Sequence, residues 1–413
     1  MMQEIMQYGA RLRGFSRNAR VYLLANFLGS LYYGVFGVLG NLYFMQAGLS
    51  EGFLGTMISV GSLTRVAFAV PAGLLSDRIG RRNALFVAAG IIAVAEAIMI
   101  TFPTPVTVIV AFAMASAAST IMMVTGSPFL TENSTREERS HLFSVSMACH
   151  TVSGVGGSVL GGLLPIIWGG ALGLAADSFL VYRMTLFTAL VLLALSVIPY
   201  SRIREVRQAV DRPKAWPLRL HNPRLTAKLA LPELLMGLGA GMFVPFLNVY
   251  FSRHLFASAA QVGFIFSAMN LVTTVAVLWA PVLGMRRGKI GATVLTRLLS
   301  IPILLVIALT GNLWVAAVAA WVRSALMNMS NPLMGSFSME ILSAKERATV
   351  SSILNMLWSL GWGLSAKLAG HIMQNYSYTM PYYFTVVLYT ASALLLYYFF
   401  GRDEKQLLAA AGD

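Results

Sequence analysis

The chain has 413 residues, of which 57% are apolar and only 11% are charged. A soluble globule of this size still exposes roughly a quarter of its unfolded surface, which demands far more polar residues than this chain has. The composition therefore excludes a soluble or a disordered protein and predicts a polytopic membrane protein. The net charge of +14 would suggest nucleic-acid binding, but its Lys and Arg residues lie in bands between apolar segments. We therefore expect no nucleic-acid partner.

Apolar segments of about 20 residues, long enough to cross a bilayer, recur twelve times. The first six are expected near 21–45, 52–75, 83–102, 105–130, 142–166 and 179–200. The second six are expected near 228–252, 260–284, 292–310, 313–338, 349–373 and 380–400. The predicted fold class is all-α, with twelve transmembrane helices in two pseudo-symmetric six-helix bundles.

The charged segments divide the chain into parts. We expect a cytoplasmic N-terminal segment (1–20), a first bundle (21–200), a basic cytoplasmic linker (201–227), a second bundle (228–400) and a cytoplasmic tail (401–413). Residues 1–20 contain arginines but no long apolar run, so no cleavable signal peptide is expected. Most Lys and Arg residues fall in the termini and in alternate loops, and the positive-inside rule then places both termini in the cytoplasm. The expected location is the plasma membrane, which in a Gram-negative cell is the inner membrane.

The two halves of the chain resemble each other at an offset of about 207–210 residues. Residues 41–44 read NLYF and residues 248–251 read NVYF. Glu132 is followed by Arg139, and Glu340 is followed by Arg347 at the same spacing. Two related bundles joined by a linker are typical of a secondary transporter whose binding site lies near the midplane.

A motif after the second span identifies a family that the chain resembles. Residues 73–82 read GLLSDRIGRR, which matches every fixed position of the G-x-x-x-D-R-x-G-R-R loop of the major facilitator superfamily. The resemblance implies a gate of charged residues at the cytoplasmic side. Its predicted members are Gly73, Asp77, Arg78, Gly80, Arg81, Arg82, Glu132, Arg139, Glu340 and Arg347.

Elementary electrostatics supports this gate. The Asp77 carboxylate can lie against the positive N-terminus of a neighbouring helix, and the loop arginines can pair with Glu132 and Glu137. The second copy of the loop, GMRRGKIG at 284–291, lacks the aspartate, so we expect an asymmetric gate. The alternative is that these charges only set the topology.

Ionisable residues inside spans are costly and are therefore candidates for function. The resemblance implies that spans three, six, nine and twelve are peripheral, which places Glu96 and Arg297 outside the cavity; Arg297 is expected to reach the membrane interface. Arg323 shares a helical stripe with Met327 and Ser330 near mid-depth. The predicted substrate-binding residues are Arg65, Arg323, Met327, Ser330, Asn26, Tyr33, Trp358 and Lys367. A structural arginine that binds backbone carbonyls is the alternative for Arg323.

Two further residues are candidates for ion coupling. Glu233 lies one turn into the seventh span, where a carboxylate in a low dielectric readily takes up a proton. The alternative is an ion pair with Arg323 or Arg65, or a place among the lipid headgroups. His150 is the second candidate, although it shares its stripe with glycines that suit helix packing.

These residues predict a secondary active transporter of a small anionic or amphipathic organic solute, working by alternating access and coupled to protons or Na⁺. The runner-up is a multidrug exporter of lipophilic or cationic compounds, although Ser153 and Ser158 interrupt the antiporter signature of the fifth span. A sensor with a transporter fold is a third possibility. We expect no enzymatic activity, no cofactor and no metal, because the chain has no phosphate-binding loop and only Cys149 as a cysteine. The protein is expected to be a monomer in the bilayer.

Overall fold

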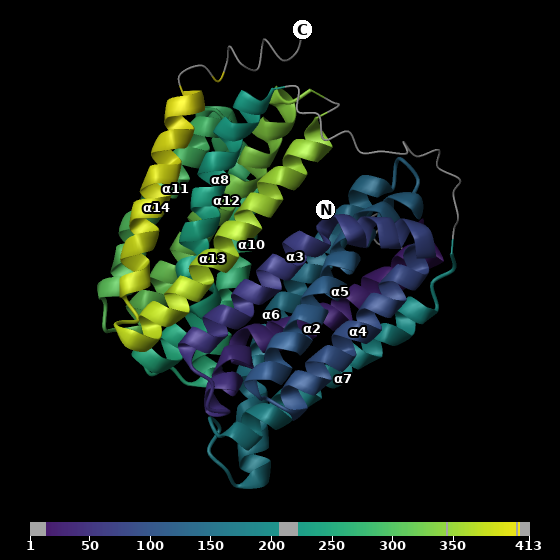
Figure 1. Ribbon diagram of the computed structural model, residues 1–413, viewed down its shortest axis with the longest axis vertical. Helices are drawn as coiled ribbons and strands as arrows, with labels where there is room; N and C mark the ends of the chain where they lie inside the picture. Colours follow the sequence, from purple (N-terminus) through teal and green to yellow (C-terminus); the bar gives the residue numbers. More distant parts are fainter. Residues whose placement is uncertain (1–13, 206–221, 344–345, 402–403, 405–413) are drawn as a thin grey trace, which may run out of the picture. The chain divides into compact units, whose positions relative to one another are not determined.

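The computed structural model describes residues 14–205, 222–343, 346–401 and 404. The predicted ends of the chain and most of the predicted linker lie outside this part. Within it, all regular structure is helical (Figure 1). The long helices of the first half are α2 (Arg17–Gln46), α3 (Glu51–Ile79), α4 (Arg81–Thr101), α5 (Pro105–Glu132), α6 (Arg139–Leu172) and α7 (Phe179–Ser201). Those of the second half are α8 (Pro223–Phe243), α10 (Ala259–Arg287), α11 (Lys289–Leu309), α12 (Leu313–Ile341), α13 (Arg347–Asn375) and α14 (Met380–Leu396).

Short irregular turns extend two of these helices. A 3-10 turn (Val244–Phe246), a short α9 (Leu247–Val249) and a π-turn (Tyr250–His254) continue α8, and a second π-turn (Tyr397–Gly401) continues α14. With these extensions, each predicted span corresponds to one long helix, and the predicted fold class is confirmed. Eleven helices in the described ranges are long and apolar enough to cross a membrane. The exception is α13, which is long enough but has a lower mean hydropathy than the other spans.

Among the described residues, the first of two compact units comprises 14–43 and 67–205. It contains α2, α4 to α7 and the second half of α3, and α4 packs against α5 and α7 (Figure 1). Helices α2 and α6 approach so closely at Gly34 and Gly157 that a Cβ atom on Gly34 would lie 2.7 Å from the Gly157 Cα. Small residues permit this approach, which is the usual way in which membrane helices pack.

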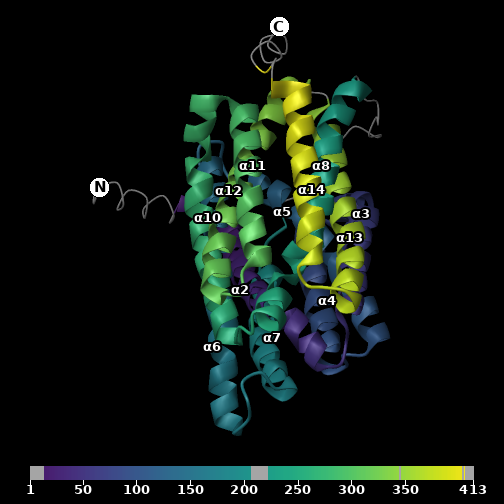
Figure 2. The same cartoon turned by 90° about the vertical axis from the view of Figure 1, so that its left-hand side faces the viewer.

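The second unit comprises residues 44–66, 222–343, 346–401 and 404 of the described chain. Helix α8 packs against α13 and α14, and α11 packs against α12 and α14 (Figure 2). The first half of α3 belongs to this unit and lies on α13, where a Cβ on Gly55 would meet the Ala366 carbonyl oxygen at 2.5 Å. The Tyr378 hydroxyl donates to Glu51 at the start of α3. Burial, together with this hydrogen bond to the carboxylate, raises the pKa of the Tyr378 hydroxyl above its ordinary value.

The sequence repeat appears as a repeated hydrogen bond. The Tyr43 hydroxyl donates to the Ile100 carbonyl at 2.6 Å, and the Tyr250 hydroxyl donates to the Ile307 carbonyl at 2.7 Å. Each bond ties the end of the unit's first helix to the end of its third. Equivalent residues therefore occupy equivalent places in the two units.

Candidate functional site: an ion-paired pocket and two charged helix junctions

The loop motif forms the junction between α3 and α4. Helix α3 ends at Ile79, and Gly80 turns the chain with φ 89°, a left-handed conformation that favours glycine. Arg81 then pairs with Asp77 at 2.8 Å (Nη1 to Oδ1) and with Glu132 at 3.4 Å (Nε to Oε1). Its Nη1 also donates to the Ser76 hydroxyl at 2.8 Å. The guanidinium thus holds the ends of α3 and α5 together through its fork of donors.

A carboxylate that the motif does not include completes this junction. Glu205, which follows α7, accepts the backbone N–H groups of Arg81 and Arg82, each at 2.9 Å. These N–H groups are the unpaired donors that open α4, where a negative charge is favoured. The carboxylate that caps α4 is thus that of Glu205, while Asp77 pairs with Arg81.

The second unit repeats the junction with different chemistry. Gly288 has φ 76°, and the carboxylate of Glu404 accepts the backbone N–H of Lys289 at 2.6 Å at the start of α11. The Lys289 ammonium pairs with Glu340 and donates to Ser336 at 3.0 Å. Lys289 thus replaces Arg81, while Glu340 and Glu404 occupy the places of Glu132 and Glu205. The sequence showed the missing aspartate but did not show Lys289 as the partner of Glu340.

The two later arginines of the predicted gate bind backbone. Arg139 Nη2 donates to the Thr131 carbonyl at 3.4 Å, and Arg347 Nε donates to the Leu342 carbonyl at 3.1 Å. Both contacts satisfy carbonyls near the end of the preceding helix, which otherwise lack partners. Arg82 Nη2 similarly donates to the Ser201 carbonyl at 3.0 Å. These arginines therefore fasten helix ends beside the acidic clusters.

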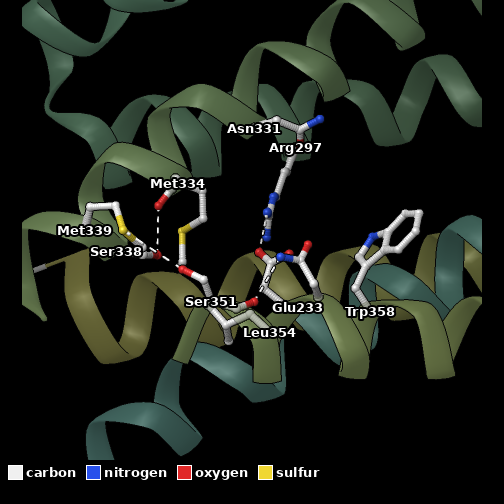
Figure 3. Close-up of a pocket in the computed structure, with 11 residues that line it drawn as sticks. Glu233, Arg297, Asn331, Met334, Ser338, Met339, Ser351, Leu354 and Trp358 are labelled. Atoms are coloured by element: carbon white, nitrogen blue, oxygen red, sulfur yellow. Dashed lines mark hydrogen bonds and ion pairs between the residues drawn. The ribbon is translucent and has the colours of Figure 1, made fainter. Parts of the chain in front are cut away.

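An open pocket of about 390 Å³ is lined by residues of the second unit from α8, α11, α12 and α13 (Figure 3). Its wall combines apolar side chains with amides, hydroxyls and one ion pair. The lining residues are Glu233, Arg297, Asn331, Met334, Gly335, Ser338, Met339, Ser351, Leu354, Asn355 and Trp358. Small-molecule sites have this volume and this mixture of surfaces.

The ion pair in this wall joins α8 to α11. Arg297 Nη2 lies 2.9 Å from Glu233 Oε1, and the two side chains are 2% and 18% exposed (Figure 3). Arg297 Nη1 also donates to the Ser392 hydroxyl at 3.3 Å, and this hydroxyl donates to the Pro232 carbonyl at 2.9 Å. Arg297 is therefore buried behind the carboxylate, and Glu233 is the charged side chain that the pocket reaches more easily.

This geometry corrects two expectations. Arg297 does not reach the membrane interface, because its guanidinium points into the unit and is almost completely buried. It is also not remote from the pocket, since it lines the wall. The partner of Glu233 is Arg297 rather than Arg323 or Arg65. The periodicity of α11 placed Arg297 on a helix face but did not reveal that α8 presents an acid to that face.

The structure packs Arg323 among aromatic rings. Its guanidinium carbon lies 4.4 Å from the Phe243 ring centroid and 5.6 Å from that of Tyr389, and Nη2 donates to the Tyr389 hydroxyl at 2.9 Å. The side chain is buried, and its Nε has no hydrogen-bond partner among the residues that the structure describes. Met327 and Ser330 from the same stripe are buried as well; Met327 Sδ accepts from the Ser300 hydroxyl at 2.9 Å. This stripe faces the interior of its own unit.

Of the remaining residues that the sequence predicted for substrate binding or ion coupling, one lines the pocket and the others lie outside its lining. Trp358 lines the pocket beside Glu233, and its ring packs 5.0 Å from Trp362. Arg65 Nη2 donates to the Ser62 hydroxyl at 3.0 Å on its own helix, and Lys367 is exposed on α13. In the first unit, Asn26 accepts from Ser30, while Tyr33 and His150 are exposed. Among these residues, the pocket brings together Glu233 and Trp358.

Comparisons with known proteins agree with this architecture. The family model of the major facilitator superfamily matches residues 22–366 and 229–412. No curated protein matches by sequence. A solved bacterial homologue of the human lysosomal transporter Spinster, in an inward-facing and occupied conformation, superimposes with a TM-score of 0.76 at 14% identity, covering 92% of this chain and 95% of the other.

Two other solved structures are similar. The nucleoside transporter NupG gives a TM-score of 0.74 at 14% identity, covering 94% of this chain and 99% of the other. The D-xylose–proton symporter gives 0.68 at 13% identity, covering 92% and 96%. At such identities these likenesses establish the fold alone, whereas the family model spans most of the chain. The chain is a multi-pass membrane protein that belongs to the major facilitator superfamily of transporters.

Proposed function

We propose that this protein is a secondary active transporter that moves a small amphipathic organic solute across the plasma membrane by alternating access, driven by protons. The observation that carries the proposal is the pocket lined by α8, α11, α12 and α13. Its thioethers and indole suit an apolar body, while its amides, hydroxyls and carboxylate suit a polar end. Met334 and Met339 adapt to solutes of different shape because thioether side chains are flexible and polarisable.

The charges of the pocket indicate which polar end it accepts. Glu233 is the more exposed member of the ion pair, and Arg297 lies behind it. A hydrogen-bond donor or a positively charged group on the solute would therefore meet the carboxylate first. This supports the reading in which lipophilic or cationic compounds are carried. An anionic solute would instead use Arg65, Lys367 or an Arg323 released from Tyr389.

Proton coupling and gating form part of the same proposal. Glu233 and His150 are the proposed coupling residues, and Glu233 is already paired with Arg297. The Arg81 and Lys289 junctions are proposed as gates that open and close with the cycle. With both termini in the cytoplasm, these junctions lie at the cytoplasmic side, and one monomer suffices for transport.

A melting-temperature screen tests the substrate class. Purified protein is heated with anionic, zwitterionic or cationic amphiphiles, and a ligand at a hundredfold excess over its Kd stabilises the folded state by about 2.7 kcal/mol. We expect cationic or donor-bearing amphiphiles to raise the melting temperature, and Trp358→Ala to abolish the shift. Trp314→Ala, an exposed tryptophan outside the pocket lining, is the control.

Solute exchange by the protein in proteoliposomes then tests turnover. Counterflow of the stabilising compound is expected in the wild type and not in empty vesicles. Stabilisation without counterflow would favour a sensor. Stabilisation by anions that is lost in Arg323→Ala, and not in Trp358→Ala, would contradict the proposed site.

A further inference from the structure

The first unit buries a carboxyl that the proposed mechanism does not yet use. Glu96 lies on α4, and it is 2% exposed. Its Oε2 accepts a 2.6 Å hydrogen bond from the hydroxyl of Tyr32 on α2, and Tyr32 is itself completely buried. The helix around it presents alanine, methionine and isoleucine to the same core. An acid has therefore been placed in an apolar interior with a phenol as its partner.

The charged groups of the neighbouring helices lie elsewhere. Helix α5 carries Glu132 at its far end, where it belongs to the Arg81 junction. Helix α7 carries Arg183, whose Nη2 donates to the Thr101 carbonyl at 2.8 Å and whose guanidinium lies near two phenylalanine rings. Two tyrosines, Tyr182 and Tyr200, are the other ionisable residues of α7. Within the described ranges, the structure shows no cation that pairs with Glu96.

Desolvation then decides the protonation state. An isolated carboxylate in an apolar interior is so costly that the group takes up a proton instead. One hydrogen bond from a neutral phenol offsets only a small part of this cost. The protonated acid can keep the bond, since its carbonyl oxygen still accepts. The geometry therefore favours Glu96 as a place where a proton can bind, because burial penalises the charged form and no cation of the described residues balances it.

The phenol that binds this acid also packs against an exposed ring of the same helix. Tyr33, the next residue on α2, is 44% exposed, and its ring packs edge-on against Tyr32 with centroids 5.5 Å apart. A displacement of α2 relative to α4 would open the Tyr32 bond and admit water to the carboxyl. Glu233 differs from Glu96 in its partner, because the Arg297 guanidinium balances the charge of Glu233.

We propose that Glu96 is a proton-binding site of this transporter and that Tyr32 positions it, so that the first unit carries the proton while the second unit binds the solute. The inference rests on the proposed transport function, and it adds Glu96 to the proposed coupling residues Glu233 and His150. Each cycle would load one proton on the Glu96 carboxylate in one conformation and release the same proton to water in the other.

Difference infrared spectroscopy on the full-length protein tests the site without any substrate. The carbonyl-stretch band of a buried protonated carboxylic acid is followed as the pH is raised. We expect this band in the wild type and its loss in Glu96→Gln. Glu51→Gln is the matched control, because Glu51 also accepts from a tyrosine hydroxyl but is only partly buried. A band that survives in Glu96→Gln would overturn the proposal.

Transport measurements test the role. In proteoliposomes, an imposed pH gradient should stimulate wild-type uptake, and Glu96→Gln should lose this stimulation while retaining counterflow without a gradient. Tyr32→Phe should shift the pH at which the infrared band disappears and leave counterflow intact; an unchanged pH would contradict the positioning role. If Glu233→Gln loses gradient stimulation and Glu96→Gln keeps it, Glu96 does not couple. Absence of any wild-type transport would refute the proposed function, while the infrared result would still decide whether Glu96 binds a proton.

Discussion

The first unit holds Glu96 against the Tyr32 hydroxyl, whereas the second unit holds Glu233 against the Arg297 guanidinium. The two residues are chemically identical and both lie within helices of apolar bundles. A guanidinium partner balances the charge of the carboxylate, because opposite charges offset each other's desolvation. A phenol partner brings no counter-charge and supplies one hydrogen bond. The partner, rather than the residue type, therefore decides whether a buried acid has its charge balanced.

The largest expected effect comes from breaking the ion pair. Glu233→Ala leaves Arg297 buried without a counter-charge, which should cost about 3–5 kcal/mol of folding stability. Glu96→Gln, which removes no ion pair, should change stability far less. Thermal unfolding of both variants by circular dichroism compares them. The double variant Glu233→Ala with Arg297→Met should regain most of the loss; if it does not, the ion pair is not the cause.

A second prediction concerns the close packing of helices at glycines. Both units contain such packing, so an added methyl group should destabilise both. Gly34→Ala would place a Cβ 2.7 Å from the Gly157 Cα, and Gly241→Ala would place one 2.3 Å from the Trp362 carbonyl oxygen. Such overpacking typically costs about 1–3 kcal/mol, so both variants should melt at lower temperature. Gly37→Ala, in α2 with no atom within 4 Å of the added carbon, should not. Equal melting temperatures for the three variants would contradict tight helix packing at Gly34 and Gly241.

The smallest expected effect comes from the charged junctions. Arg81 reaches both Asp77 and Glu132, which a lysine cannot do with the same fork of donors. Arg81→Lys should therefore slow solute counterflow severalfold, whereas Lys289→Arg should change it little. Partly exposed pairs contribute about 0–1 kcal/mol each, so melting temperatures should barely move. Equal slowing in both variants would contradict an asymmetric gate.

Much of the fold was predictable because a bilayer allows few solutions. The backbone must satisfy its own hydrogen bonds in lipid, so each apolar run of sufficient length becomes a helix. The repeat was also visible, and Tyr43 and Tyr250 make equivalent bonds. The prediction was wrong for Arg297, because helix periodicity gives the face of a side chain and not the residue that another helix places opposite it.

The sequence by itself determined the family, the number of helices and the loop motif, since these depend on local composition and on short spacings. Only the tertiary structure decided which charges are paired. Glu205 and Glu404 cap α4 and α11 from more than a hundred residues away, and Glu96 meets Tyr32 across 64 residues of sequence. In an apolar interior one partner changes the state of a carboxyl, and partners at such separations are chosen by helix packing.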